Sequence, residues 1–214
     1  GFVMNRFLKR AWAEIDLDAL EHNYNEIKKL AKGKDILAVV KANAYGHDDK
    51  AVCLKLQELG VKYYGVSNLW EGEKLRQHGI TGTILTFGYT DEDYFDELLE
   101  YGITQTAGSV QYAKQLSDYA VSKGVKLPVH IKVNTGMTRV GIDSQQEMLD
   151  ILAMPGLDCK AAYTHFAAAD SLDPSDVEYT DRQQEKLMKI AKDKGLLIHS
   201  QNSGGIIYHG DFGG

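Results

Sequence analysis

The chain has 214 residues, of which 43% are hydrophobic and 25% are charged, as in an ordinary soluble globular protein with one large domain or most of one. Its net charge of −6 and its lack of a basic cluster argue against a nucleic-acid partner. No apolar run approaches the ~20 residues of a membrane span, and the cysteine and histidine spacings fit no metal motif, so we expect no metal site.

Strand and helix patterns alternate along the chain. Residues Ala11–Leu17 alternate as a strand does, and Asp18 is predicted to be the N-cap of the helix that follows. Further strands are predicted at Ile36–Val40, Tyr63–Ser67, Thr83–Phe87, Ile103–Thr106, Val129–Asn134, Cys159–His165 and Leu197–Asn202. Helices are predicted at 49–59, before Gly79, after the caps Thr90 and Ser109, at 143–154 and at 179–194.

Strands that alternate with helices through short connections are typical of consecutive βαβ units in a parallel sheet. From residue 36 onward the strands number about seven, whereas a closed barrel of this class has eight. An open doubly wound sheet is the alternative, but such sheets seldom carry polar residues at every strand end. We therefore predict an α/β fold, a (β/α)8 barrel of the TIM type, truncated before its eighth strand and with two unpaired sheet edges.

A lysine follows the first strand of this barrel. Leu37, Val39 and Lys41 share one face of the strand because side chains alternate, so the amine points the same way as the core side chains before it. Desolvation at such a place favours the neutral amine, which can act as a nucleophile or a base. The alternative is that Lys41 is simply the first polar residue after a strand.

Polar side chains also share one face of the strand Val129–Asn134. His130, Lys132 and Asn134 point one way, and the apolar residues between them point the other way. Polar groups on a buried strand must find partners inside the barrel mouth. Arg139 follows after a glycine turn and can reach an anion or a phenolic oxygen there, with a structural ion pair as the alternative.

Two further strand ends carry groups that can bind a cofactor. His165 is followed by small residues that leave room for a planar group, although a histidine satisfied by its neighbours is the alternative. Asn202 and Ser203 precede two glycines, and such a turn can form a phosphate cradle or be merely flexible. Together these groups fit a phosphorylated aldehyde cofactor bound to a lysine, or a lysine-dependent aldolase.

Five motifs occur together in the chain. They are WAEIDLDAL at 12–20 with Asn23, VKANAYGH at 40–47, KVNTGMTRVG at 132–141, THFAAAD at 164–170 and HSQNS at 199–203. In order and spacing they resemble the alanine racemase family, a group of pyridoxal 5′-phosphate (PLP) enzymes, over residues 11–205. The tracts at 88–90 and 169–171 resemble the serine/alanine racemase domains associated with vancomycin resistance.

The resemblance implies a role for each matching residue in binding PLP. Lys41 would hold PLP as a Schiff base and, once released by substrate, act as one of two proton-transfer bases. Tyr45 and Ser203 would bind the phosphate of PLP. His165 would pack against the pyridine ring, and Asn202 would lie beside the cofactor.

The resemblance also implies how substrate is bound. Arg139 would contact the phenolic oxygen of PLP and the substrate carboxylate. Lys132 matches a family position that is often carbamylated, where the carbamate orients Arg139. Asp48 and Asn134 depart from the family pattern, but neither change removes a cofactor contact.

Residues 1–214 would then be an incomplete PLP-binding barrel domain. Family members continue with an eighth strand and a C-terminal β domain, absent here, whose tyrosine serves as the second base in the partner subunit. We therefore expect a full-length homodimer that converts L-alanine to D-alanine, or acts on serine, for cell-wall precursor supply. We expect this fragment by itself to be inactive.

Two other functions stay open as alternatives. One is a non-catalytic PLP-binding barrel of the PLP homeostasis type, which lacks the VKANAYGH and TGMTR motifs, and the other is a PLP decarboxylase. The expected partner is a small amino-acid substrate. Two widely spaced cysteines and the lack of a signal-peptide pattern favour a cytoplasmic location, with a membrane-tethered parent protein as the alternative.

Overall fold

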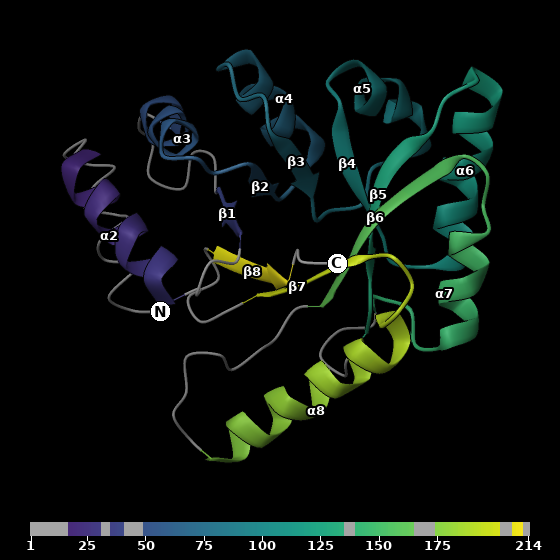
Figure 1. The fold of residues 1–214 in the computed structure, drawn as a ribbon. Coiled ribbons are helices and arrows are strands. Elements are labelled where there is room, and N and C mark those ends of the chain that lie inside the picture. Colours follow the sequence, from purple (N-terminus) through teal and green to yellow (C-terminus); the bar gives the residue numbers. More distant parts are fainter. Residues whose placement is uncertain are drawn as a thin grey trace.

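The computed structural model describes residues 17–30, 35–40, 49–134, 140–164, 174–201 and 207–211. Eight strands form a closed barrel in chain order, and the first seven are parallel (Figure 1). The strands are β1 (Ile36–Val39), β2 (Tyr63–Val66), β3 (Thr83–Thr86), β4 (Ile103–Ala107), β5 (Leu127–Lys132), β6 (Leu157–Thr164), β7 (Leu197–Gln201) and β8 (Ile207–Asp211).

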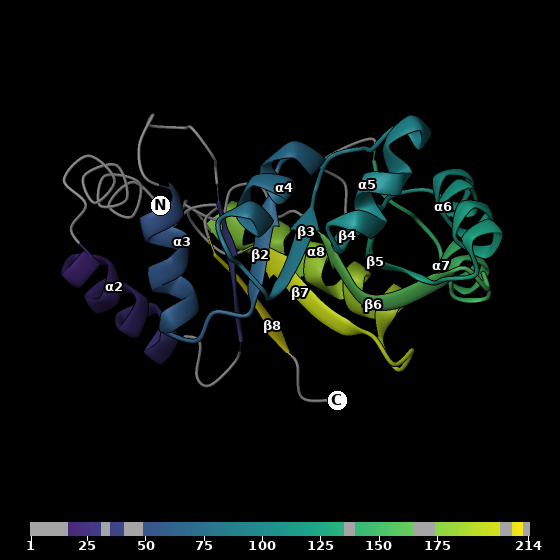
Figure 2. The same cartoon turned by 90° about the horizontal axis from the view of Figure 1, so that it is seen from above.

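Helices connect the strands and lie outside the barrel (Figure 2). They are α2 (Leu17–Leu30), α3 (Asp49–Glu58), α4 (Leu69–Gln77), the 3₁₀ helix η1 (Glu92–Tyr94), α5 (Phe95–Glu100), α6 (Val110–Lys123), α7 (Gln145–Leu152) and α8 (Pro174–Ala191). In the part of the chain that the structure describes, none of these helices combines the length and the apolar character needed to cross a bilayer.

The predicted parallel barrel is confirmed, but the predicted open edges are wrong. β8 runs antiparallel to the other strands and pairs with β1 on one side and with β7 on the other. Because its direction is reversed, β8 is not the eighth parallel strand of a full (β/α)8 barrel. Unpaired N–H and C=O groups at a sheet edge are costly, and this chain satisfies them with its own residues.

Several element starts differ from the prediction. α2 begins at Leu17, so Asp18 lies within its first turn and is not the N-cap; residues 11–16 of the strand predicted before it lie outside the described residues. α8 begins at Pro174 and not at residue 179. β5 and β6 each begin two residues earlier than predicted. Helix and strand ends depend on local hydrogen-bond competition, so they are the least determined part of a sequence pattern.

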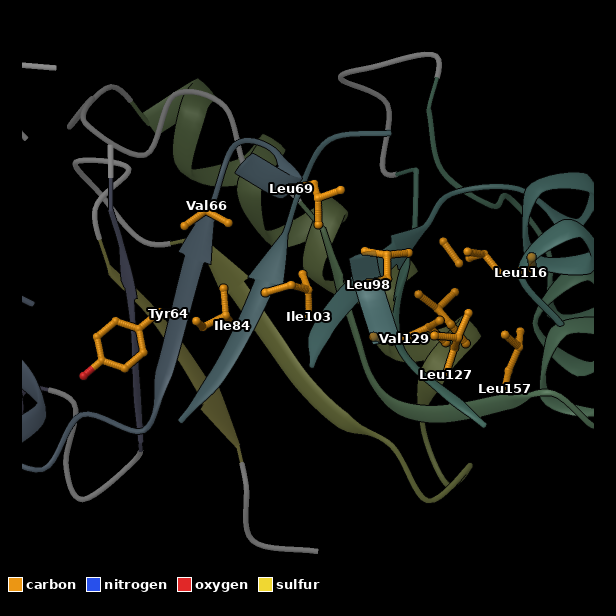
Figure 3. Packing of buried hydrophobic residues seen from close by; sticks show 14 of the residues in the cluster. Tyr64, Val66, Leu69, Ile84, Leu98, Ile103, Leu116, Leu127, Val129 and Leu157 are labelled. Carbon is orange, nitrogen blue, oxygen red and sulfur yellow. The ribbon is translucent and has the colours of Figure 1, made fainter. Parts of the chain in front are cut away.

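The main hydrophobic core lies between the barrel and the helices. It combines outward-facing strand residues, such as Ile84, with inward-facing helix residues, such as Leu98 of α5 (Figure 3). Ile131 and Val133 belong to this core, which confirms the predicted alternation along β5 because their neighbours on the strand face the barrel interior.

A second, smaller apolar cluster fills the barrel interior. Leu37, Leu85 and Tyr163 are buried there, and Phe87 packs against them. The rings of Phe87 and Tyr163 meet edge to face, with centroids 5.9 Å apart. Gly65 of β2 makes room for this packing, because a Cβ there would lie 2.4 Å from Phe87 Cζ and 2.9 Å from Leu37 Cδ2.

His130 of β5 also faces the barrel interior and is only 3% exposed. Burial lowers the pKa of its imidazole to about 3, because the charged form loses its hydration. At neutral pH the side chain is therefore uncharged in the folded protein. An uncharged imidazole is compatible with the apolar cluster nearby, whereas an imidazolium is not.

At the amino ends of the strands, Arg76 of α4 joins two turns. Its guanidinium donates hydrogen bonds to the carbonyls of Ile80 and Gly82, at 2.9 and 2.7 Å, in the turn before β3. It also donates to the carbonyls of Tyr101 and Gly102, at 2.7 and 2.9 Å, in the turn before β4. Backbone carbonyls that would otherwise lack partners are thereby satisfied by one side chain.

We predict that Gly65→Ala destabilises the protein by about 1–3 kcal/mol, because the added methyl group overpacks the barrel interior. Chemical denaturation of the wild type and the variant measures this change. The matched control repeats the substitution in a Phe87→Leu background, where the smaller side chain relieves the overlap and the cost of Gly65→Ala is lower. An equal cost in both backgrounds would show that Phe87 does not limit the space at Gly65.

We predict that His130 makes the protein less stable as the pH falls below about 6.5, the pKa of an unfolded histidine. Below about pH 6.5 the unfolded chain binds a proton that the folded chain takes up only near pH 3, so the free energy of unfolding falls as the pH decreases through this range. Between pH 7 and pH 5 this effect amounts to about 2 kcal/mol. Denaturant midpoints of His130→Leu should fall less steeply over that interval than those of the wild type. The exposed His22 supplies a control, His22→Leu, for the effect of replacing a histidine by leucine at the surface.

Candidate functional site

The carboxyl ends of the seven parallel strands meet at one mouth of the barrel, the face where barrels of this class carry their active sites. The predicted site residues follow four of these ends: Lys41 and Tyr45 come after β1, Arg139 after β5, His165 after β6, and Asn202 and Ser203 after β7. All six lie outside the described residues. The described strands that precede them converge on one mouth.

β1 leads to this mouth, and the residues on its inner face are those that the sequence predicts. Leu37 belongs to the interior cluster and Val39 packs against it, whereas Ile36, Ala38 and Val40 belong to the outer core. The backbone N–H of Val40 donates to the carbonyl of Gly65 at 2.8 Å. β1 is therefore held in register as far as Val40, which is the first residue of the VKANAYGH motif and the last described residue before Lys41.

Lys132 is the one predicted site residue whose side chain the structure describes. It lies at the carboxyl end of β5, facing the interior, and is 9% exposed. Burial lowers the pKa of its amine. Within the described parts of the chain, no hydrogen bond or ion pair to the Lys132 side-chain amine is formed. A buried amine without a counter-charge favours the neutral, nucleophilic form.

A pair of buried hydroxyl groups crosses the inner face of β5. Thr106 Oγ1 of β4 and the Tyr163 hydroxyl of β6 are 2.8 Å apart, within hydrogen-bond distance. Lys132 and Tyr163 are partners in the register of β5 and β6, so this bond lies next to the lysine. Burial raises the pKa of the Tyr163 phenol, which therefore stays protonated. Sequence analysis missed this pair, although Tyr163 shares a strand face with His165.

The segment that carries Arg139 is anchored to β5 on both sides. The backbone N–H of Ile142 donates to the carbonyl of Lys132 at 2.9 Å, and that of Asn134 donates to the carbonyl of Ile142 at 2.8 Å. This close return requires Gly141, whose φ of 134° and contact with Asn134 leave no room for a Cβ. Asn134 and Ile142, on either side of residues 135–139 in the chain, are therefore held beside Lys132.

A buried glutamine fixes the loop that follows β3. The Gln105 side chain donates to the carbonyl of Gly88 at 2.8 Å and to that of Thr106 at 3.0 Å, and accepts from Thr90 Oγ1 at 2.6 Å. The Tyr112 hydroxyl donates to the Thr90 carbonyl at 2.6 Å. Thr90 is thus bound inside this network.

The prediction that Thr90 caps the next helix is therefore wrong. The side chain of Asp91 caps η1 instead, accepting from the Asp93 backbone N–H at 3.0 Å. Asp91 has no competing buried partner, whereas the Thr90 hydroxyl is already bonded to Gln105. Ser109 does cap α6, as predicted, by accepting from the backbone N–H of Tyr112.

The opposite end of the barrel holds a pocket of about 620 Å³, lined by His130, Thr104 and Tyr63 among others. This end of a TIM-type barrel is associated with stability and not with catalysis. Among the described residues, no group of three or more histidine, cysteine, aspartate or glutamate side chains is arranged to hold a metal ion. The described side chains at the mouth supply the amine of Lys132 and the hydroxyls of Thr106 and Tyr163.

Known proteins resemble this chain in sequence and in fold. Residues 15–213 match the family described as alanine racemase, N-terminal domain. An alanine racemase from Clostridium perfringens is 39% identical over 214 residues, which covers 95% of this chain and 55% of that protein. The chain thus spans about half the length of the curated relatives it matches.

Solved structures agree with the sequence match. An alanine racemase from Clostridium difficile has a TM-score of 0.76 at 33% identity, covering 85% of this chain and 49% of that one. A histidine racemase from Leuconostoc mesenteroides has a TM-score of 0.74 at 29% identity, covering 83% and 48%. On the match of residues 15–213, the relatives and the shared barrel, the chain belongs to the alanine racemase family, as its N-terminal barrel domain.

Proposed function

We propose that this barrel is the PLP-binding half of an amino-acid racemase that acts on alanine, or on serine. The observation that carries the proposal is the convergence of β1, β5, β6 and β7 on one mouth, each followed by one of the family motifs. Relatives with this barrel bear the names alanine racemase and histidine racemase, which supports racemisation more firmly than a particular substrate. The resemblance of the tracts at 88–90 and 169–171 to serine/alanine racemase domains keeps serine open as a substrate.

The residues around this mouth fit PLP. When bound, PLP supplies an electron sink that stabilises negative charge on the substrate α-carbon. The alternation of Leu37 and Val39 supports an inward direction for Lys41, which would hold the cofactor aldehyde. Hydroxyl groups of Tyr45 and Ser203, with the backbone amides of the turn after β7, would bind a phosphate.

The remaining assigned residues would orient the ring and the substrate. The flat imidazole of His165 would pack on the pyridine face, and Asn202 would lie beside the ring. Arg139 would bind the substrate carboxylate and the phenolic oxygen, since a guanidinium offers a fixed fork of donors. The anchoring of residues 134 and 141–142 on β5 supports a fixed position for that fork.

Racemisation removes a proton from one face of the α-carbon and returns a proton to the other face, so it needs a base on each side. Lys41 reaches one face only. We propose that the second base comes from the C-terminal β domain of a partner subunit, in a homodimer of the longer protein. By the same reasoning, residues 1–214 alone would bind cofactor without catalysing turnover.

As a carbamate, Lys132 would orient the guanidinium of Arg139. Two neighbouring cations repel one another by a few kcal/mol, on the order of Coulomb's law at intermediate dielectric. A neutral Lys132 amine can bond to the carbon of CO₂ and release a proton to solvent, which leaves an anion beside the guanidinium. Its burial and lowered pKa support this reaction, because only the neutral amine reacts.

We propose a cytoplasmic location for the parent protein. Cys53 and Cys159 are thiols that form no disulfide among the described residues, and burial raises the pKa of Cys159 to about 11, which keeps it unreactive. Free thiols of this kind are common in proteins of a reducing compartment.

We predict that borohydride reduction of the PLP-loaded chain attaches the cofactor to Lys41. Peptide mapping by mass spectrometry locates the adduct, and Lys41→Ala should lose both the adduct and the visible absorbance band. The matched control is Lys50→Ala, an exposed lysine on α3, which should leave labelling unchanged. An adduct on another lysine in the wild type would overturn the assignment. Chiral product analysis on the longer protein then tests racemisation itself.

We predict that ¹³C-labelled bicarbonate at neutral pH yields a carbamate carbon resonance from Lys132. The resonance should vanish in Lys132→Met and persist in Lys62→Met, because Lys62 is an exposed amine. It should weaken on acidification, since protonation of the amine removes the nucleophile. Wild-type protein without the resonance, or Lys132→Met with it, would contradict the assignment.

A further inference from the structure

The pocket at the amino ends of the strands lies beneath the apolar cluster of the barrel interior. It has a volume of about 620 Å³, which is within the range of small-molecule sites. Tyr63 lines the pocket and also packs against the interior cluster. Thr104 lines it too, and Thr106, the next residue toward the mouth on the same face of β4, bonds to Tyr163. The interior cluster and this bond therefore lie between the pocket and the mouth.

A buried hydroxyl group of β4 faces this pocket. Thr104 is 5% exposed and lines the pocket, whereas its neighbour Ile103 belongs to the outer core on the other face of the strand. In the described parts of the chain, the Thr104 hydroxyl forms no hydrogen bond. Removing a hydroxyl from bulk water without giving it a partner is unfavourable. The Thr104 hydroxyl is therefore placed to donate a hydrogen bond to a molecule in the pocket.

The charged side chains around the pocket are cationic. Lys62, Arg76 and Lys160 line it, and none of its described lining residues is an aspartate or a glutamate. The hydrogen bonds of Arg76 to four backbone carbonyls hold its guanidinium in place without neutralising its charge. Lys62 forms no ion pair within the described parts of the chain. A hollow lined by charges of one sign attracts ions of the other sign, so this pocket favours an anion.

Two carboxylates lie near the pocket without lining it. Asp158 pairs with Lys160 at 2.8 Å and offsets the charge of that lysine. Burial and, second, the negative charge of Asp35 raise the pKa of the Tyr63 phenol, which therefore stays protonated. Lys62 and Arg76 thus keep positive charges that neither carboxylate neutralises.

We propose that this pocket binds a small organic anion. Its oxyanion group is bound by the charges of Lys62 and Arg76 and accepts a hydrogen bond from Thr104, while its apolar part contacts Pro128 and Leu197, which also line the pocket. An oxyanion supplies both the counter-charge and the acceptor that these groups require, whereas a cation or an apolar molecule supplies neither. The inference does not depend on the proposed function, because this pocket lies at the opposite end of the barrel from the mouth.

The test titrates the chain with phenyl phosphate and follows the NMR resonances of the His130 imidazole, which lines the pocket. We expect a saturable shift, and phenol, which has the same ring without the charge, should bind at least about tenfold more weakly. Thr104→Val should weaken the binding of phenyl phosphate about tenfold, as the loss of one hydrogen bond to a charged group implies. Lys62→Gln should weaken it about threefold, because this lysine is exposed and its charge is partly screened.

Thr86→Val and Lys114→Gln are the matched controls. Thr86 is a buried threonine of β3 that faces away from the interior, because Leu85 and Phe87 face inward, and Lys114 is an exposed lysine on α6 that pairs with Asp118. Both controls should keep the wild-type affinity for phenyl phosphate. Thermal unfolding without ligand shows that each variant is folded, and Lys62→Gln keeps the test decisive if Thr104→Val does not fold.

Three results would each overturn the proposal: no saturable shift at His130, equal affinities for phenol and phenyl phosphate, or affinities of Thr104→Val and Lys62→Gln that match those of the controls. Phenyl phosphate bound at the mouth would give the last of these results, because neither substitution lies there. A chain that binds no PLP would contradict the proposed function and leave this inference standing.

Discussion

Closure of the barrel is the constraint on which the remainder of the structure depends. Every strand has two hydrogen-bonded neighbours, so each strand side chain faces either a confined interior or the surrounding helices. The interior accommodates the rings of Phe87 and Tyr163 because Gly65 leaves space beside them. The same closure brings the carboxyl ends of β1, β5, β6 and β7 to one mouth. Packing and site geometry therefore have a common cause.

Desolvation acts on two neighbouring polar residues of β5 with different consequences. His130 is held neutral by burial, which makes stability depend on pH. Lys132, one alternation nearer the mouth, is held toward its neutral form where an amine can react. Between β4 and β6, the hydroxyls of Thr106 and Tyr163 satisfy each other. Burial therefore has three outcomes for these residues: a neutral imidazole, an amine with a lowered pKa and a paired set of hydroxyls.

Different side-chain and backbone hydrogen bonds hold the two ends of the barrel. At the amino ends, Arg76 binds four carbonyls and holds the turns before β3 and β4. At the carboxyl ends, Gln105 fixes the loop after β3, and the backbone N–H of Ile142 bonds to the carbonyl of Lys132. Catalytic loops on a rigid scaffold can vary while the scaffold remains stable.

The amino-acid sequence by itself determined the seven parallel strands to within two residues at each end, the order of those strands and their helices, and which face of β5 is polar, because these follow from periodicities of a few residues within one element. The motifs after the strands likewise indicated the family and the mouth as the site. Only the tertiary structure decided that β8 closes the barrel antiparallel to β1, that Thr106 meets Tyr163 across β5, and that Thr90 binds Gln105 and leaves the cap to Asp91. Each of these contacts joins residues whose local patterns carry no information about one another, and they meet because barrel closure and burial bring their elements together.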